Sequence, residues 1–405
     1  MGFDSRQSTP GFKRQMVVTC GEARSFKRAS LWLERAVGLK VSPNTIERIC
    51  LDVGEDLSTA AEHNWQGILN GEAVVPQVAV VGTDGGRIRT RIDDGQPGVR
   101  LQGKGWNETK NAIFVSANSE TSTDDPEPDP PACFLDRNHV AKLTETAKAK
   151  ENPDRDSPLP DAPQAPKTKE KRPKKPHKPK RIHRTVISSM KNSADFGIQM
   201  KREAERRKFD QASRRAFVGD GLACNWKIHE EHFSDYVAIL DFVHAVSYLF
   251  SASLVCFGRG DEAWQHYSRW MTLAWQGKVG EVIDELLEHQ RRLGEAPAEC
   301  DEDDPREQLR KIIGYLRNNQ VRMKYDEYRR AGLPTTSAWM ESAVKEINYR
   351  TKGTEMFWNN PAGAEAILQI RSAALSDDDR LVRFLTRRVG SARLRREKST
   401  PSVAA

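Results

Sequence analysis

The segment "QVAVVGTDGGRIRTR", residues 77–91, is the part of the sequence from which the fold can be inferred first. Its apolar first half ends in a single carboxylate, Asp84, and two glycines follow at once. A short apolar run that ends in turn residues is typical of a buried strand. Arg87, Arg89 and Arg91 then alternate, which places them on one face of a second strand. We therefore expect an acid at the end of one strand, space beside it, and a basic strand next to it.

The same layout recurs in "AFVGDG", residues 216–221, where a short apolar strand is followed by Asp220 and a glycine. If the two strands lie side by side, both acids are at one end of a sheet. Two nearby carboxylates repel each other when both are ionised. A divalent cation offsets that repulsion, and Mg²⁺ prefers oxygen ligands. The alternative is that both Asp-Gly pairs are ordinary hairpin turns.

A third acid, Glu341, lies within "LPTTSAWMESAVKEINYRTKG", residues 333–353, which we expect to form a helix. Lys345 and Asn348 follow at helical spacing, so the three side chains share one face. The pair Glu341 and Lys345 is equally compatible with a surface ion pair. The basic residues expected to contact phosphate here and on the arginine strand are Arg87, Arg89, Lys345, Arg350 and Lys352.

The segment "YVAILDFVHAVSYLF", residues 236–250, predicts a strand that runs into a helix. It contains Asp241 and, three residues later, His244. This pair could support a metal site or contact DNA near the cleaved phosphate. The alternative is that His244 is a hydrogen-bonded core residue. An acid inside the longest apolar stretch of the chain also argues against a membrane span.

The order of these motifs resembles the DDE transposases of bacterial insertion sequences, which have an RNase H-like core. The Asp-x-x-His spacing is similar to that in relatives of the Mutator and hAT superfamilies. The resemblance implies that Asp84, Asp220 and Glu341 are the catalytic residues and the metal ligands, with Asp241 and His244 as an accessory pair. It implies Mg²⁺ as the cofactor, for which Mn²⁺ can substitute. The implied reaction is cleavage of transposon-end DNA and strand transfer into target DNA, by a homo-oligomer on double-stranded DNA.

Two alternatives stay open at this point. One is a catalytically inactive or domesticated remnant of a transposase that still binds DNA. The other is a nuclease of the same fold that cuts DNA but does not join it. The presence of all three acids favours an enzyme.

The composition agrees with a polyanionic partner. The chain has 405 residues and a net charge of +7, and a basic balance favours nucleic acid. Six widely spaced cysteines form no Cys-x-x-Cys pair, so we expect reduced thiols and no zinc site. The first twenty residues lack the apolar region of a secretory signal, so we expect a cytoplasmic protein with no membrane partner.

We predict an α/β fold: an RNase H-like mixed sheet flanked by helices, with an all-helical insertion and a helical N-terminal module. Ser42 and Pro43 mark the start of a helix that could be the DNA-reading helix of a helix-turn-helix, or could simply pack. Before the long Pro/Lys-rich loop we expect an antiparallel meander of three short strands. The expected parts are a helical module at 1–72, core at 73–117, a disordered Pro/Lys-rich loop at 118–184, core at 185–257, the helical insertion at 258–332, core at 333–380 and a basic tail at 381–405.

Overall fold

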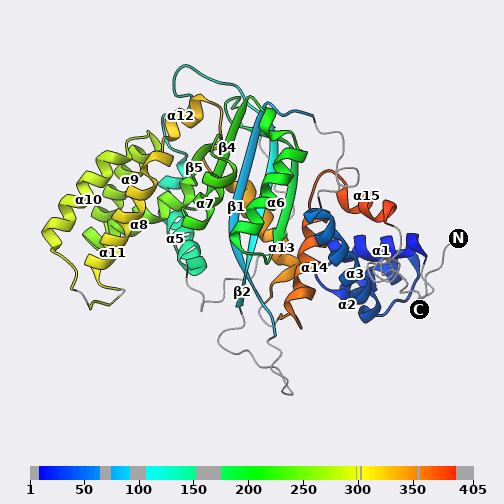
Figure 1. The fold of residues 1–405 in the computed structure, drawn as a ribbon. Helices are drawn as coiled ribbons and strands as arrows, with labels where there is room; N and C mark the ends of the chain where they lie inside the picture. Colours follow the sequence, from blue (N-terminus) through cyan, green and yellow to red (C-terminus); the bar gives the residue numbers. More distant parts are fainter. Residues whose placement is uncertain are drawn as a thin grey trace, which may run out of the picture.

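The protein is an α/β protein built on a five-stranded mixed sheet (Figure 1). The computed structural model describes residues 9–63, 74–91, 106–151, 175–297, 299–301, 303–353 and 356–388. The strand order is β3-β2-β1-β4-β5. The strands are β1 (Val78–Arg89), β2 (Trp106–Asn118), β3 (Lys180–Ser189), β4 (Arg214–Gly219) and β5 (Val237–Leu240).

The first three strands form an antiparallel meander, and β4 and β5 extend it in parallel with β1. Parallel neighbours need a crossover, which a helix usually supplies. Here α6 (Ser193–Arg206) and the 3₁₀ turn Phe209–Gln211 precede β4, and α7 (Ala223–His232) connects β4 to β5.

The meander differs from the prediction in which segments form it. Residues 78–89 are one continuous strand that pairs with β2 along its whole length, from Val78 opposite Ala117 to Arg89 opposite Trp106. The two glycines after Asp84 stay extended, so the alternative hairpin turn does not form there, and Asp84 lies within the strand and not at its end. The third strand of the meander is β3, which comes much later in the chain.

Helices cover both faces of the sheet. On one face α7 packs against β4, where Trp226 lies close to Gly219. On the other face α13 (Ala338–Thr351) packs against β1, where Met340 lies close to Gly82. Figure 1 shows α6 and α13 on opposite sides of β1, and α14 (Pro361–Ala374) contacts β3.

The predicted helical insertion is present beside the β5 edge of the sheet (Figure 1). It follows directly from α8 (Phe242–Phe257), which begins one residue after Asp241. Its helices are α9 (Asp261–Trp275), α10 (Val279–Leu293), α11 (Pro305–Asn319), the 3₁₀ turn Gln320–Arg322 and α12 (Tyr325–Arg330).

The segment predicted to be disordered, 118–184, contains regular structure at both of its ends. A 3₁₀ turn, Ala132–Leu135, leads into α5 (Arg137–Glu151), and α5 packs beside α8. The end of the basic tract forms the start of β3, since pairing with β2 satisfies its backbone hydrogen bonds. Residues 152–174 lie outside the described part of the chain.

The N-terminal module contains α1 (Pro10–Glu22), α2 (Phe26–Val37) and α3 (Pro43–Glu62). As predicted, Ser42 caps α3: its hydroxyl accepts a hydrogen bond from the Thr45 amide. The apolar side of α3 lies along α14, so closely that a methyl group added at Gly54 would overlap the backbone of Ala366. Part of α3 therefore packs the core, and a DNA-reading role for this helix stays a prediction.

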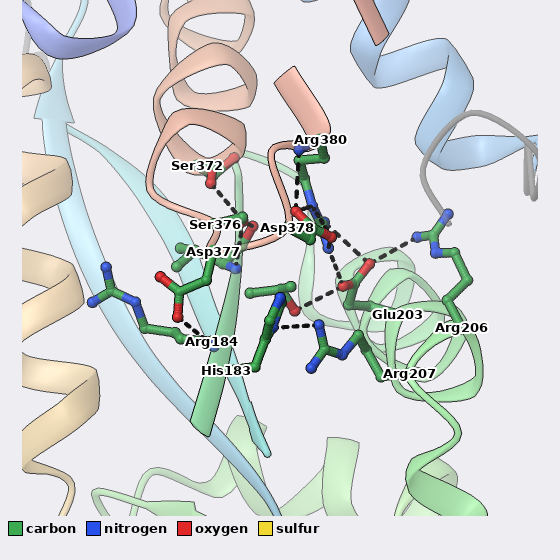
Figure 2. A network of polar contacts seen from close by, with 12 residues as sticks. His183, Arg184, Glu203, Arg206, Arg207, Ser372, Ser376, Asp377, Asp378 and Arg380 are labelled. Atoms are coloured by element: carbon green, nitrogen blue, oxygen red, sulfur yellow. Dashed lines mark hydrogen bonds and ion pairs between the residues drawn. The ribbon is translucent and has the colours of Figure 1, made fainter. Parts of the chain in front are cut away.

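A buried ion network ties the C-terminal segment to the sheet (Figure 2). Glu203 of α6 accepts hydrogen bonds from Arg380, at the start of α15 (Arg380–Arg387), and from Thr185 of β3. Asp378 pairs with the same guanidinium. Burial would raise the pKa of Glu203, but the charges of Arg380 and Arg206 outweigh it and lower the pKa to about 2. The network is a structural brace, since opposite charges compensate each other inside the protein.

None of the helices in the described parts of the chain combines the length and the apolar character of a membrane span.

Candidate active site at strands β1 and β4

The parallel pairing of β1 with β4 brings Asp84 next to Asp220. Gly82 of β1 lies opposite Val218 of β4. Asp84 and Asp220 are each two residues further on, so they follow the same register on the same face of the sheet. The predicted juxtaposition of these two acids is therefore present, whereas their catalytic role stays a prediction.

The environment of Asp220 is that of a carboxylate in a crowded anionic site. Burial raises its pKa, the charge of Asp84 raises it further, and the proximity of His244 acts in the opposite direction. One carboxylate oxygen, Oδ1, accepts hydrogen bonds from the Leu222 amide at 3.1 Å and from Nδ2 of Asn225 at 2.8 Å. A cation beside the two acids would offset their repulsion, so the oxygen donors present fit Mg²⁺ or Mn²⁺.

A row of polar side chains continues from the acids across the sheet. Asp84 lies opposite Asn111 of β2, and Asn111 lies opposite Ser188 of β3. The Ser188 hydroxyl donates to Oδ1 of Asn111 at 2.6 Å. Sequence reasoning missed Asn111 and Ser188, because only the pairing of strands far apart in the chain aligns them with the acids.

The two glycines after Asp84 have different roles. A methyl group added at Gly85 would have nothing within 4 Å, so this glycine does leave open space next to the acid. One added at Gly86 would lie 2.6 Å from the hydroxyl of Thr109, so this glycine allows β2 to approach. The expectation of cleared space is thus correct for the first glycine only.

Glu341 lies on the helix that covers the same face of the sheet. Its neighbour Met340 has its Cβ 3.5 Å from the position of a methyl group at Gly82, two residues before Asp84. The Glu341 side chain is 28% exposed, and Nζ of Lys345 lies 4.0 Å from its carboxylate. Within the described parts of the chain, no three His, Cys, Asp or Glu side chains lie close enough together to form a metal site. The structure therefore joins two of the three predicted acids, and the third stands on a neighbouring helix.

Asp241 and His244 form the predicted pair. Asp241 is 0% exposed, and its Oδ2 accepts hydrogen bonds from Nδ1 of His244 at 2.8 Å and from the Ser337 hydroxyl at 2.9 Å. Burial would raise the pKa of Asp241, but these hydrogen bonds and one from the Ser337 amide hold it below its usual value. His244 also lies near enough to Asp220 for its charge to act on the pKa of that acid, so the Asp241–His244 pair adjoins the two acids.

Two of the predicted basic residues, Arg89 and Lys352, form a cluster with an aromatic ring at the far end of the β1–β2 pair. The guanidinium of Arg89 and the ammonium of Lys352 both lie over Trp106, at 4.6 and 5.2 Å from its ring centre. Lys345 is 69% exposed on α13, and Arg87 is partly exposed on β1. A phosphate contact by any of these four residues stays a prediction.

Arg350 does not belong to this surface, and its predicted phosphate contact is wrong. The residue is 1% exposed, and its guanidinium lies over the rings of Phe26 and Trp358 at 4.6 and 5.4 Å. It also lies 3.6 Å from the sulfur of Cys20. The side chain therefore packs α13 against the N-terminal helices, because burial against aromatic faces suits a guanidinium.

No protein-family model matches this chain, and a search of characterised proteins also finds no match.

Proposed function

We propose that the protein is a metal-dependent enzyme that cuts DNA, and specifically a transposase that cleaves transposon-end DNA and transfers the strand into target DNA. The observation that carries this proposal is the pairing of Asp84 with Asp220 across β1 and β4. A protein places two mutually repelling, largely buried carboxylates together at a cost in stability, and binding a cation is a common reason for it.

The sheet supports the finer proposal that the core is RNase H-like. An antiparallel meander extended by two parallel strands, with helices on both faces, agrees with the fold that the motif order implied. Asp84 lies on the central strand and Asp220 directly follows its parallel neighbour, where the resemblance expects the two acids.

In the proposed reaction Asp84, Asp220 and Glu341 would hold the Mg²⁺ or Mn²⁺ ions. When bound, such ions activate the attacking oxygen and stabilise the leaving oxygen at phosphorus. The protein itself supplies the negative charge, and Asp241 orients His244 toward the acids. Glu341 would be the third ligand, since its helix covers the face of the sheet on which the two acids lie.

DNA would approach along the basic cluster at the end of the β1–β2 pair. Arg87, Arg89, Lys345 and Lys352 would neutralise backbone phosphates, in agreement with the net charge of +7. A transposase must bring two ends together, so we propose a homo-oligomer on DNA.

Strand cleavage tests this function directly. The substrate is DNA from the borders of the genetic element that encodes the protein, incubated with Mg²⁺, with Mn²⁺ or with EDTA. We expect wild type to nick it only with metal, and Asp220→Asn to bind the DNA without nicking it. Asp261→Asn, the same change at an exposed position on α9, should cleave like wild type.

A second candidate is a DNA-binding remnant without catalysis. The separation of Glu341 from the acid pair favours it, because Glu341 is engaged with Lys345 instead. Binding by wild type without any nicking would select this candidate and overturn the enzyme.

A further inference from the structure

The turn that carries Asp220 is covered by the helical insertion. Tyr315 of α11 donates a hydrogen bond from its hydroxyl to the backbone carbonyl of Asp220, at 2.8 Å. The two residues are 95 positions apart in the sequence. The insertion thus contacts the same residue that pairs with Asp84.

Gly221 is shaped for this contact. Its φ is +98°, a conformation that favours glycine, and a methyl group there would lie 2.6 Å from the Tyr315 ring. The glycine after the second acid therefore admits a tyrosine ring, whereas the first glycine after Asp84 leaves open space. The two Asp-Gly motifs look alike in the sequence, but their glycines have different structural roles.

The Tyr315 ring is itself held in place by a second aromatic ring. Tyr248 of α8 stacks on it with ring centres 3.6 Å apart and planes at 5°. A second contact fixes the other side of the turn: Arg322 lies 4.4 Å from the ring centre of Trp226, and Trp226 packs on Gly219. The insertion therefore grips the Asp220 turn both before and after the acid.

We infer that Tyr315 is a positioning residue, through which the helical insertion holds the Asp220 carboxylate beside Asp84. The Tyr315 hydrogen bond holds the peptide between Asp220 and Gly221, and the Leu222 amide that follows this peptide donates to Oδ1 of the carboxylate. The inference rests on the proposed function, because positioning matters for a pair of acids that bind a cation. It makes the insertion a part of the active site.

Tyr315→Phe tests the inference in the full-length protein, because it removes the hydroxyl and keeps the ring. Tyr328→Phe is the matched control: its hydroxyl donates to the carbonyl of Ala238 on β5 at 3.2 Å, away from the acids. Mn²⁺ binding is measured by titration calorimetry without DNA. We expect Tyr315→Phe to weaken Mn²⁺ binding about threefold to tenfold, the effect of one lost hydrogen bond, and Tyr328→Phe to leave it unchanged.

Amide hydrogen exchange without metal gives a second readout, on peptides that cover residues 219–225. We expect faster exchange in Tyr315→Phe and wild-type exchange in Tyr328→Phe. Equal exchange in all three proteins would overturn the inference, whatever the metal result. If wild type binds Mn²⁺, an equal Mn²⁺ affinity of Tyr315→Phe would also overturn it. Failure of wild type to bind Mn²⁺ would instead count against the proposed function, and the exchange comparison would still decide whether Tyr315 holds the turn.

Discussion

Asp241 and Ser337 are joined by two hydrogen bonds of 2.9 Å each, although 96 residues separate them. Asp241 caps α8, and Ser337 immediately precedes α13, the helix that carries Glu341. Asp241, the acid of the Asp-x-x-His motif, therefore holds the start of α13, the helix that carries Glu341. Its role in any catalysis includes this structural link, in addition to orienting His244.

Ser337→Ala should lower the free energy of unfolding by about 1 kcal/mol, since it removes one hydrogen bond to a buried carboxylate. Asp241→Ala should cost about 3 kcal/mol or more, because it leaves His244 and Ser337 without their shared acceptor. Urea unfolding measures both. Ser342→Ala, at an exposed position on the same helix, is the control and should stay within about 0.5 kcal/mol of wild type.

Asp220→Asn should stabilise the metal-free protein at neutral pH. The raised pKa of Asp220 means that its protonated form suits the folded state better, so stability falls as pH rises above the ordinary value of 3.8. Asparagine removes that loss, and the advantage of the variant over wild type should shrink as pH is lowered towards 3.8. Thermal unfolding in EDTA across this range is the measurement.

Mn²⁺ should stabilise wild type more than Asp220→Asn. At ten times its dissociation constant it should stabilise wild type by about 1.4 kcal/mol, and it should stabilise Asp220→Asn much less. A variant that gains as much as wild type would show that Asp220 is not a ligand.

Glu203→Gln should destabilise the protein by about 3–5 kcal/mol, because it removes the main partner of the buried Arg380 (Figure 2). The pKa of Glu203 is lowered to about 2, so its contribution is complete above the ordinary value of 4.5 and is lost as pH falls from there to about 2. Acid unfolding of wild type and of the variant should therefore converge at low pH. Glu205→Gln, on the exposed side of the same helix, should behave like wild type.

Lys345→Ala and Lys352→Ala should each weaken DNA binding and reduce the slope of log K against log salt by about 0.9. Lys227→Ala is the control, since Lys227 is 70% exposed on α7, which covers the other face of the sheet. Fluorescence anisotropy over a range of salt concentrations measures the slope. An equal change in the Lys227 variant would mean that the effect reflects net charge and not a binding surface.

Arg350→Ala should instead act on folding. It should lower the free energy of unfolding by about 2 kcal/mol or more, since it leaves space between Phe26 and Trp358 in the core. For the folded variant, the slope of log K for DNA binding against log salt should stay at the wild-type value. A slope reduced by about 0.9 would instead show that Arg350 does contact a phosphate.

The amino-acid sequence alone was sufficient for most of the elements and for the two central acids. Strand β4, the change from β5 to α8, the cap of α3 at Ser42 and the helical insertion all follow from local apolar period and capping chemistry. These features depend on near neighbours in the chain, which is why their patterns can be read directly.

Only the tertiary structure decided which strands meet and which side chains are buried. It made residues 78–89 one strand, turned the end of the basic tract into β3, and buried Arg350 in the core. It also placed the Tyr315 hydroxyl on the carbonyl of Asp220, a contact that no local sequence motif predicts. The physical reason is that backbone pairing and the burial of long side chains depend on partners far along the chain, and local composition carries no record of those partners.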